Sequence, residues 1–242
     1  MRSSYLIEAL GTFVLVLIGC GTVTMAVLFD SYTSLFQVAA MWGMGVTLAI
    51  EISKTRSHAH LNPAVSLAMV VLNKYPIKQL LPLMLSQLMG AVLAGICLFL
   101  MMQGHASYQE PSLMFGEFFP NPSYADQVQI DWIGAMLAEA MGTFALVMAI
   151  LWITRGGGKL SLSQSMLIGL AVSSIIMVLA PYTQAGINPA RDLGPRLVAY
   201  IAGWRDMALA GSSWPQSIAV YVAGPFLGAA VAAKLAQRLR FA

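Results

Sequence analysis

The chain contains the same pattern twice. Residues 8–16 are EALGTFVLV and residues 139–147 are EAMGTFALV, so seven of the nine positions are identical. The triplet Asn62-Pro63-Ala64 likewise returns as Asn188-Pro189-Ala190. Self-similarity of this kind indicates a duplicated architecture. We therefore expect one domain, residues 1–242, made of two homologous halves, residues 1–105 and 131–242, which residues 106–130 connect.

Long apolar runs fill both halves. Apolar residues make up 58% of the chain and charged residues only 10%, against roughly a quarter in a soluble domain. Runs such as residues 10–29 and 80–102 reach the ~20 residues that a helix needs to cross the lipid bilayer. The sequence predicts an all-α membrane protein. The expected spans cover residues 5–28, 35–53, 80–102, 132–154, 164–181 and 215–236.

The segment from Leu17 to Cys20 imitates the cleavage site of a lipoprotein signal peptide. A cleavable peptide has no reason to be duplicated as an internal helix, so the repeat favours a permanent first span. Cys20 and Cys97 both fall inside expected spans, where a thiol usually packs as a small hydrophobic group. We expect no disulfide.

The distribution of charge predicts the orientation. Three spans per half is an odd number, so the second half enters the membrane from the opposite side and the repeats are inverted. With a cytoplasmic N-terminus, ten of the 13 Lys and Arg residues lie inside. Both termini are then cytoplasmic, and the connection 106–130 is external. The connection carries Glu110, Glu117 and Asp126 and no Lys or Arg, as an external loop may. This scatter of basic residues at the ends of spans argues against a nucleic-acid partner.

Each Asn-Pro-Ala triplet precedes a short apolar run, residues 65–72 and 193–201, that cannot cross a bilayer. Asn is a strong N-cap residue and Pro is favoured at the first helical position, so both triplets predict the start of a re-entrant half-helix. In inverted repeats the two starts approach from opposite faces. Such backbone is tolerated in a membrane only where protein shields it or where it lines a wet path. A pore is implied.

The pore chemistry follows from the helix caps. If the side-chain oxygens of Asn62 and Asn188 cap their own helices, the amide NH₂ groups are free to face the lumen as donors. Each helix start also carries about half a positive elementary charge, which repels cations and protons. The arrangement suits uncharged molecules that bear hydroxyl groups.

The segments from His60 to Val65 and from Gly186 to Arg196 resemble the two signature loops of the major intrinsic proteins, the aquaporins and glycerol facilitators. The resemblance covers essentially the whole chain. It implies a homotetramer of four complete channels in the cell membrane, without cofactor or metal. It also implies that the protein is not an enzyme, and we find no Ser/His/Asp, Cys/His or metal-spaced constellation that converges on a cavity.

The resemblance assigns roles residue by residue. It implies a selectivity filter of Trp42, Ile176, Ala185 and Arg191. It implies that Glu8 and Glu139 brace the re-entrant loops. We expect the loop backbone that lines the pore to come from His58, Ala59, His60, Gln184 and Gly186. His60 resembles a family residue that shapes the loop carbonyls, whereas the family commonly has a small residue at the position of His58. Asp192, directly after the filter arginine, resembles the glycerol-conducting branch.

Ile176 stands where strict water channels of the family usually hold a histidine. An apolar wall of Trp42 and Ile176 opposite Arg191 suits glycerol, so a channel for polyols and water is our leading interpretation. However, glycerol facilitators carry a bulky aromatic at the position of Ala185, and Pro-Leu at Tyr221-Val222. The filter resembles that of plant nodulin-type intrinsic proteins and their bacterial relatives. Urea or metalloid hydroxides such as arsenite and boric acid, or water alone, stay open as alternatives.

Two further interpretations concern titratable groups. An ion-coupled secondary transporter could use Glu8 and Glu139 as a proton relay, because ionisable groups inside spans are functional candidates. Neither glutamate has a second titratable residue along its span, which favours bracing. His58 lies in a basic cytoplasmic segment, and its protonation near pH 6 to 7 is a hypothesis for control of the entrance. His105 stands alone at the start of the external loop.

Overall fold

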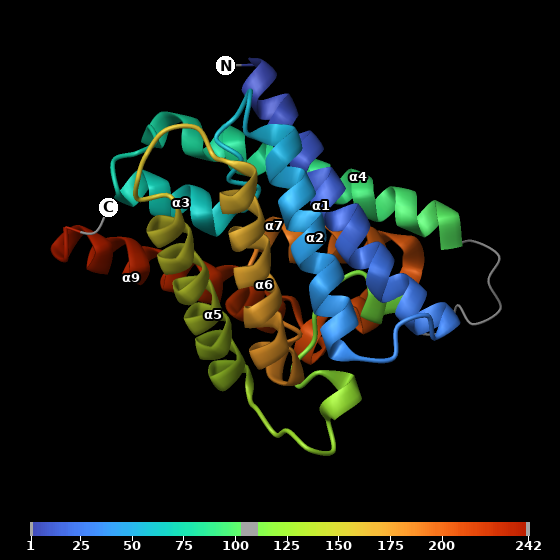
Figure 1. The fold of residues 1–242 in the computed structure, drawn as a ribbon. Coiled ribbons are helices and arrows are strands. Elements are labelled where there is room, and N and C mark those ends of the chain that lie inside the picture. Colours follow the sequence, from blue (N-terminus) through green and yellow to red (C-terminus); the bar gives the residue numbers. More distant parts are fainter. Residues whose placement is uncertain (1, 103–110, 241–242) are drawn as a thin grey trace.

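The computed structural model describes residues 2–102 and 111–240, and in this part of the chain every regular element is helical. Six helices are long and apolar enough to cross a membrane, which confirms the expected spans (Figure 1). Five are continuous: α1 (Arg2–Phe29), α2 (Leu35–Ser53), α4 (Leu80–Met102), α5 (Trp132–Ile153) and α6 (Leu162–Thr183). The sixth joins α8 (Trp214–Ile218), a π-helical turn (Ala219–Ala223) and α9 (Gly224–Arg238). His105 and Glu110 lie outside the described residues.

Two short helices begin at the Asn-Pro-Ala triplets, as expected: α3 (Pro63–Val71) and α7 (Pro189–Ala199). Asn62 and Asn188 are their N-cap residues, with extended backbone and a Pro at the first helical position. The Asn62 side-chain oxygen accepts from the N–H of Ala64 at 2.8 Å, and that of Asn188 from the N–H of Ala190 at 3.1 Å. Local cap chemistry therefore sets both starts.

The short helices are held by the opposite half of the chain. Helix α3 packs against α9, and α7 packs against α4. The side-chain amide of Gln237, near the end of α9, donates to the carbonyl oxygen of Val71, the last residue of α3. Figure 1 shows α3, in the first half of the chain, beside the red α9 at the end of it. The two halves are thus interlocked.

The long helices cross closely where glycines allow it. Helix α1 packs on α4, and α5 packs on α9 in the corresponding place. A Cβ on Gly90 would overlap the carbonyl oxygen of Ala9, and a Cβ on Gly228 would overlap that of Ala140. Small residues that let backbones approach are a usual device of helix packing in membranes.

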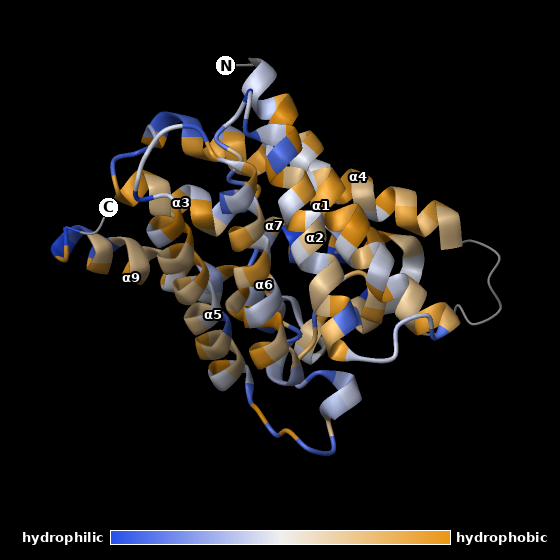
Figure 2. Cartoon of the chain, in the orientation of Figure 1, coloured by the Kyte–Doolittle hydropathy of each residue, from blue (hydrophilic) through white to orange (hydrophobic). Residues whose placement is uncertain are grey.

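The outward surface of the helices is apolar. Leu6, Met101 and Val178 are each about 70% exposed, at 71%, 72% and 67%, and Figure 2 shows orange residues along the outer helices with blue ones gathered at loops and helix ends. In water such a surface would be a large apolar patch; against lipid it is satisfied.

The connection after residue 110 does not run free in solvent. Residues 114–117 are buried, and the amide of Asn121 donates to the carbonyl oxygen of Ala180 at the end of α6. Glu117 is therefore a buried carboxylate although it belongs to a connection between spans. The cause is a set of hydrogen bonds to α7, described below.

Candidate functional site

A cavity of about 330 Å³ lies between the two halves. Three helices each give it one stripe of side chains at every fourth residue, which places the members of a stripe on one helical face. The stripes are Trp42, Val46 and Ile50 on α2; Leu146 and Ile150 on α5 with its C-cap residue Thr154; and Ile168, Val172 and Ile176 on α6. Each stripe extends over about 12 Å of helix axis. The cavity is therefore elongated along the bundle and mostly apolar.

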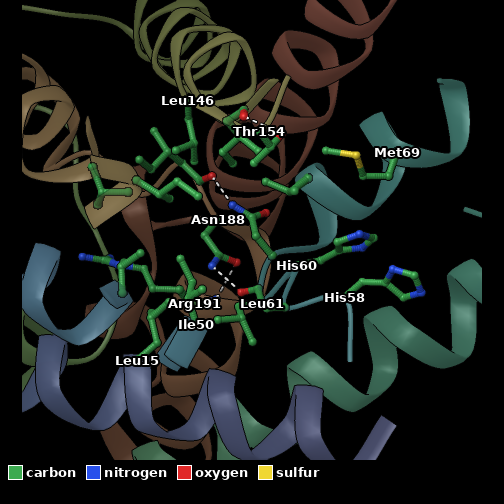
Figure 3. Close-up of a pocket in the computed structure, with 18 of the residues that line it drawn as sticks. Leu15, Ile50, His58, His60, Leu61, Met69, Leu146, Thr154, Asn188 and Arg191 are labelled. Atoms are coloured by element: carbon green, nitrogen blue, oxygen red, sulfur yellow. Dashed lines mark hydrogen bonds between the residues drawn. The ribbon is translucent and has the colours of Figure 1, made fainter. Parts of the chain in front are cut away.

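The two asparagines face this cavity from both halves. The Asn62 amide nitrogen donates to the carbonyl oxygen of Ile187 at 2.9 Å, and that of Asn188 donates to Leu61 at 2.9 Å. Figure 3 shows Asn188 and Leu61 near the middle of the view, between Leu146 and Leu15. The expectation that the amides are wholly free is thus corrected. The opposing loops come close enough to take one N–H of each NH₂ group, which leaves one N–H per asparagine.

Glu8 and Glu139 hold the loops that lead into the short helices. The two carboxylate oxygens of Glu8 accept from the backbone N–H groups of His60 and Leu61 at 3.0 and 2.9 Å. Those of Glu139 accept from Gly186 and Ile187 at 2.9 and 2.5 Å. Both carboxylates are fully buried. Leu61 and Ile187 have positive φ, which costs energy in a β-branched or bulky residue, and the carboxylates compensate for that strain.

Two neutral side chains also donate hydrogen bonds to Glu8 and Glu139. The amide of Gln87 on α4 donates to Glu8 at 3.0 Å, and the hydroxyl of Thr183 donates to Glu139 at 2.6 Å. Tyr221 adds a hydrogen bond from its hydroxyl to the carbonyl oxygen of Thr183 at 3.1 Å. Every oxygen of both carboxylates is thus occupied by a donor.

The structure brings the four expected filter residues together, since Trp42, Ile176, Ala185 and Arg191 all line the cavity. The Arg191 guanidinium lies over the Trp42 ring, 4.0 Å from its centroid. A Cβ on Gly19 would overlap the indole, so this glycine lets Trp42 lie flat against α1. A cation over an indole face is favourable and fixes the guanidinium on one side.

The acidic partner of Arg191 is Glu117, which sequence reasoning missed. Its carboxylate forms an ion pair with Nη1 of Arg191, and its side chain is only 9% exposed. Its backbone N–H donates to Asp192 at 2.9 Å, and its carbonyl oxygen accepts from Arg196. One signal was available: Glu117 lies inside the apolar segment Met114-Phe115-Gly116-Glu117-Phe118-Phe119 of an otherwise polar connection.

Asp192 and Arg196 form a second buried ion pair. Nε and Nη2 of Arg196 donate to the two Asp192 oxygens at 2.9 and 2.6 Å, and Nη1 donates to the carbonyl oxygen of Ala208 at 2.6 Å. A Cβ on Gly116 would overlap the guanidinium. The pair ties the connection and the segment after α7 to the start of α7. Asp192 itself is not among the residues that line the cavity.

The other expected loop residues separate into two groups. His58, Ala59, His60 and Gly186 line the cavity, whereas Gln184 does not. The side-chain oxygen of Gln184 accepts from the N–H of Phe118 at 2.6 Å, so this side chain is engaged with the external connection. The sequence offered no sign of that contact.

An aromatic cluster lies where His58 and His60 meet Tyr75. The ring centroids of His58 and His60 are 5.1 and 5.3 Å from that of Tyr75. Burial lowers the pKa of His60 to about 4, against an opposing effect of the Glu8 charge, and burial raises the pKa of Tyr75 to about 12. Both are therefore neutral near pH 7. Among the described residues, no group of three or more His, Cys, Asp or Glu could hold a metal ion.

Comparison with known proteins agrees with this geometry. The chain is 30% identical to the glycerol uptake facilitator protein of Haemophilus influenzae, over 98% of this chain and 94% of that one. It is 34% identical to glycerol uptake facilitator protein 3 of Lactiplantibacillus plantarum, over 94% and 93%. The X-ray structure of the aquaglyceroporin from Plasmodium falciparum superposes with a TM-score of 0.86 at 26% identity, covering 99% of this chain and 96% of that one. The family model described as "Major intrinsic protein" matches residues 1–235, and the chain belongs to that family.

Proposed function

We propose that the protein is a passive transmembrane channel for glycerol-type polyols, water and other small uncharged solutes. One observation carries the proposal. The starts of two short helices, capped by Asn62 and Asn188, meet at a cavity that both halves of a multi-pass membrane protein line. The names of the relatives, glycerol uptake facilitators, support a channel over an enzyme.

The charge at the meeting point supports the exclusion of ions. The two helix starts each contribute about half a positive elementary charge, so a cation or a proton is repelled there from both sides. The one N–H that each asparagine retains can donate to the oxygen of a neutral solute. A water molecule or a hydroxyl group is then accepted where an ion is not.

The wall of the cavity favours a solute that has an apolar side and a side with hydrogen-bond acceptors. The stripes on α2, α5 and α6 are apolar apart from Thr154. Arg191 and the asparagines supply hydrogen-bond donors, and Arg191 can donate to passing oxygens. Glycerol has a carbon backbone for the apolar stripes and hydroxyl groups for the donors, whereas water uses only the donors.

We propose further that Glu8 and Glu139 act as braces and take no part in proton transfer. Their oxygens are already bonded to backbone N–H groups, and a relay would need a chain of exchangeable partners. Asp192 then supports polyol conduction from behind the filter, through its ion pair with Arg196.

Orientation and assembly are part of the proposal. The excess of Lys and Arg at one end of the spans supports cytoplasmic termini, an external connection at residues 106–130 and inverted halves at 1–105 and 131–242. Membership of the family supports a homotetramer with one pore per subunit. Light scattering coupled to size exclusion tests this assembly, since a monomeric mass after correction for detergent excludes it.

The experiment for the channel is stopped-flow light scattering on proteoliposomes. Vesicles shrink in an impermeant sugar as water leaves, and they re-swell only if the added solute enters. We expect re-swelling in glycerol, with a rate that rises linearly with concentration and needs no ion gradient. Saturation together with a requirement for an ion gradient would instead identify a secondary transporter.

The same assay separates the alternatives within the family. Water flux without entry of any solute identifies a water-selective aquaporin. Entry of arsenite or boric acid faster than glycerol identifies a metalloid channel, for which the small side chain of Ala185 leaves room in the filter. Urea, which is planar and lacks a carbon backbone, is the comparison solute.

A further inference from the structure

The guanidinium of Arg191 is held between two unlike partners. The ring of Trp42 covers it at 4.0 Å, and the carboxylate of Glu117 forms an ion pair with it. Arg191 comes from α7 in the second half, whereas Glu117 comes from the connection between the halves. Both charged side chains are nearly excluded from solvent, at 5% and 9% exposure. The pair is therefore a buried ion pair that belongs to the folded core and not a surface ion pair.

The rest of the charge near the start of α7 is already balanced. Asp192 is paired with Arg196 through two hydrogen bonds, and this pair sums to zero. Glu117 is then the acidic side chain that offsets Arg191, and its carboxylate meets the arginine that lines the cavity. An arginine without this partner would leave a buried, uncompensated positive charge at the filter.

We propose that Glu117 is the counter-charge of the filter: it cancels the charge of Arg191, so that the filter offers hydrogen-bond donors to a neutral solute without attracting anions. Glu117 does not line the cavity and acts through Arg191, so it is a positioning residue. The inference rests on the proposed function, because it concerns what the filter admits. Cations and protons are repelled elsewhere, by the helix starts at Asn62 and Asn188.

The backbone of Glu117 supports this assignment. Its N–H and its carbonyl oxygen are both bonded, to Asp192 and to Arg196. Three separate attachments thus hold one residue of the connection against α7. A loop that only covered the cavity would not need its carboxylate turned onto the filter arginine.

The consequence concerns anionic analogues of the solute. Glycerate differs from glycerol in carrying a carboxylate in place of one CH₂OH group. In the wild type its charge meets a neutral filter, so it should not lodge there. With Glu117 neutralised, the unpaired guanidinium should hold the carboxylate in a bidentate fashion and obstruct the passage.

The test measures glycerol flux into proteoliposomes that have sodium glycerate on both sides of the membrane. As the glycerate concentration is varied, the sodium salt of a bulky sulfonate replaces it, so that the ionic strength stays constant. Glu117→Gln keeps the shape of the side chain and removes its charge. We expect half-inhibition by glycerate at a concentration at least about tenfold below that of the wild type, because one unit charge is uncovered within a few ångströms of the solute. Glu117→Asp keeps the charge and should stay close to the wild type.

Asp126→Asn is the matched control, since Asp126 is an exposed carboxylate of the same connection. It changes net charge equally and should not create sensitivity to glycerate. If Glu117→Gln does not assemble, Glu117→Ser provides the same readout. A purely structural role for Glu117 would lower all fluxes without making them sensitive to anions.

Two results would overturn the proposal: unchanged sensitivity in an assembled variant without the carboxylate, or equal sensitivity in Asp126→Asn. The proposed function is judged separately, by glycerol flux of the wild type without glycerate. If the wild type passes water alone, the comparison of variants is made on water flux, where the same tenfold shift is expected.

Discussion

The two re-entrant loops use one backbone design with different side chains. In both, an asparagine caps a short helix and a buried glutamate holds the preceding turn. In the second loop, Arg191, Asp192 and Arg196 follow the asparagine; the corresponding residues of the first are Val65, Ser66 and Val70. At these three positions, charged residues are therefore present in one copy only. We therefore expect the shared design to shape the passage and the charged residues of the second loop to distinguish solutes.

The supporting residues differ in the same way. Gln87, on α4, bonds to Glu8 and to the Ser66 hydroxyl at 3.0 and 3.1 Å. At the corresponding place in the last span, Tyr221 bonds to a backbone carbonyl oxygen instead. The first loop thus has a hydrogen-bond network in which neutral groups donate to Glu8, whereas the second has two buried ion pairs. Substitutions at corresponding positions of the two loops should therefore have unequal effects where the loops differ and similar effects where they agree.

The largest loss of stability should come from breaking the ion pair between Asp192 and Arg196. Asp192→Ala leaves the fully buried Arg196 without its carboxylate, and we expect the free energy of unfolding to fall by about 3–5 kcal/mol. Ser66→Ala, at the corresponding position of the first loop, removes one neutral hydrogen bond and should cost about 1 kcal/mol. Denaturant titration in detergent compares the two. Equal losses would contradict the asymmetry.

Removal of either bracing carboxylate, Glu8 or Glu139, should lower the free energy of unfolding by nearly the same amount. Glu8→Ala and Glu139→Ala each leave two buried backbone N–H groups without an acceptor, at about 1–3 kcal/mol per group. Glu51→Ala is the control, because this glutamate lies at a partly exposed site where it pairs with Lys54, and it should change stability by less than about 0.5 kcal/mol. A large effect in one half alone would show that the loops are not equivalent.

The next prediction concerns selectivity. Arg191→Leu removes the donors of the filter, and we expect the ratio of glycerol to urea permeability to change on the order of tenfold. Val65→Leu, at the corresponding position of α3, also lines the cavity but changes no hydrogen bond. It should lower all fluxes together. Stopped-flow measurements of the glycerol-to-urea permeability ratio distinguish these two effects. An unchanged ratio in Arg191→Leu would place the constriction elsewhere.

The smallest effect should be a dependence on pH that comes from His60 in the first loop, where the second loop has Gly186. The pKa of His60 is lowered to about 4 from 6.5. The unfolded chain therefore binds a proton first, and stability is lost as pH falls from about 6.5 to about 4, then levels off. His60→Gln should flatten this slope, measured as thermal midpoints at pH 7.5 and 5.

His58 provides the comparison for that slope, because its side chain is exposed. Burial is the larger cause of the lowered pKa of His60 and the His58 charge is a smaller one, so His58→Ala should reduce the pH dependence of stability less than His60→Gln does. The hypothesis that His58 controls the entrance is tested on flux in the same variant. If flux does not change between pH 5.5 and 8 in either protein, His58 has no such role.

Local signals made the spans and helix starts predictable. Apolar runs of sufficient length predicted six helices, and Asn followed by Pro predicted α3 and α7. The residues around the cavity were also predictable, because the repeat and the family resemblance fix their positions relative to those starts. Trp42, Ile176, Ala185 and Arg191 do line one cavity.

Contacts between distant segments were not predictable. The burial of Glu117 depends on Asp192 and Arg196, more than 70 residues away, and no local pattern encodes that distance. The same holds for Gln184, whose side chain bonds to Phe118. Each Asn amide was expected to be free, since the loop carbonyl that accepts from it belongs to the other half.

The packing of α3 against α9 has a consequence for biogenesis. The first short helix is synthesised early, yet its neighbour α9 follows it by more than 150 residues in the chain. Until that helix inserts, α3 lacks the surface that shields it from lipid, and the bond between Gln237 and Val71 cannot form. A nascent chain that stops short of α9 should therefore leave the first half unfinished, so the assembly of the early loop waits for the synthesis of the second half.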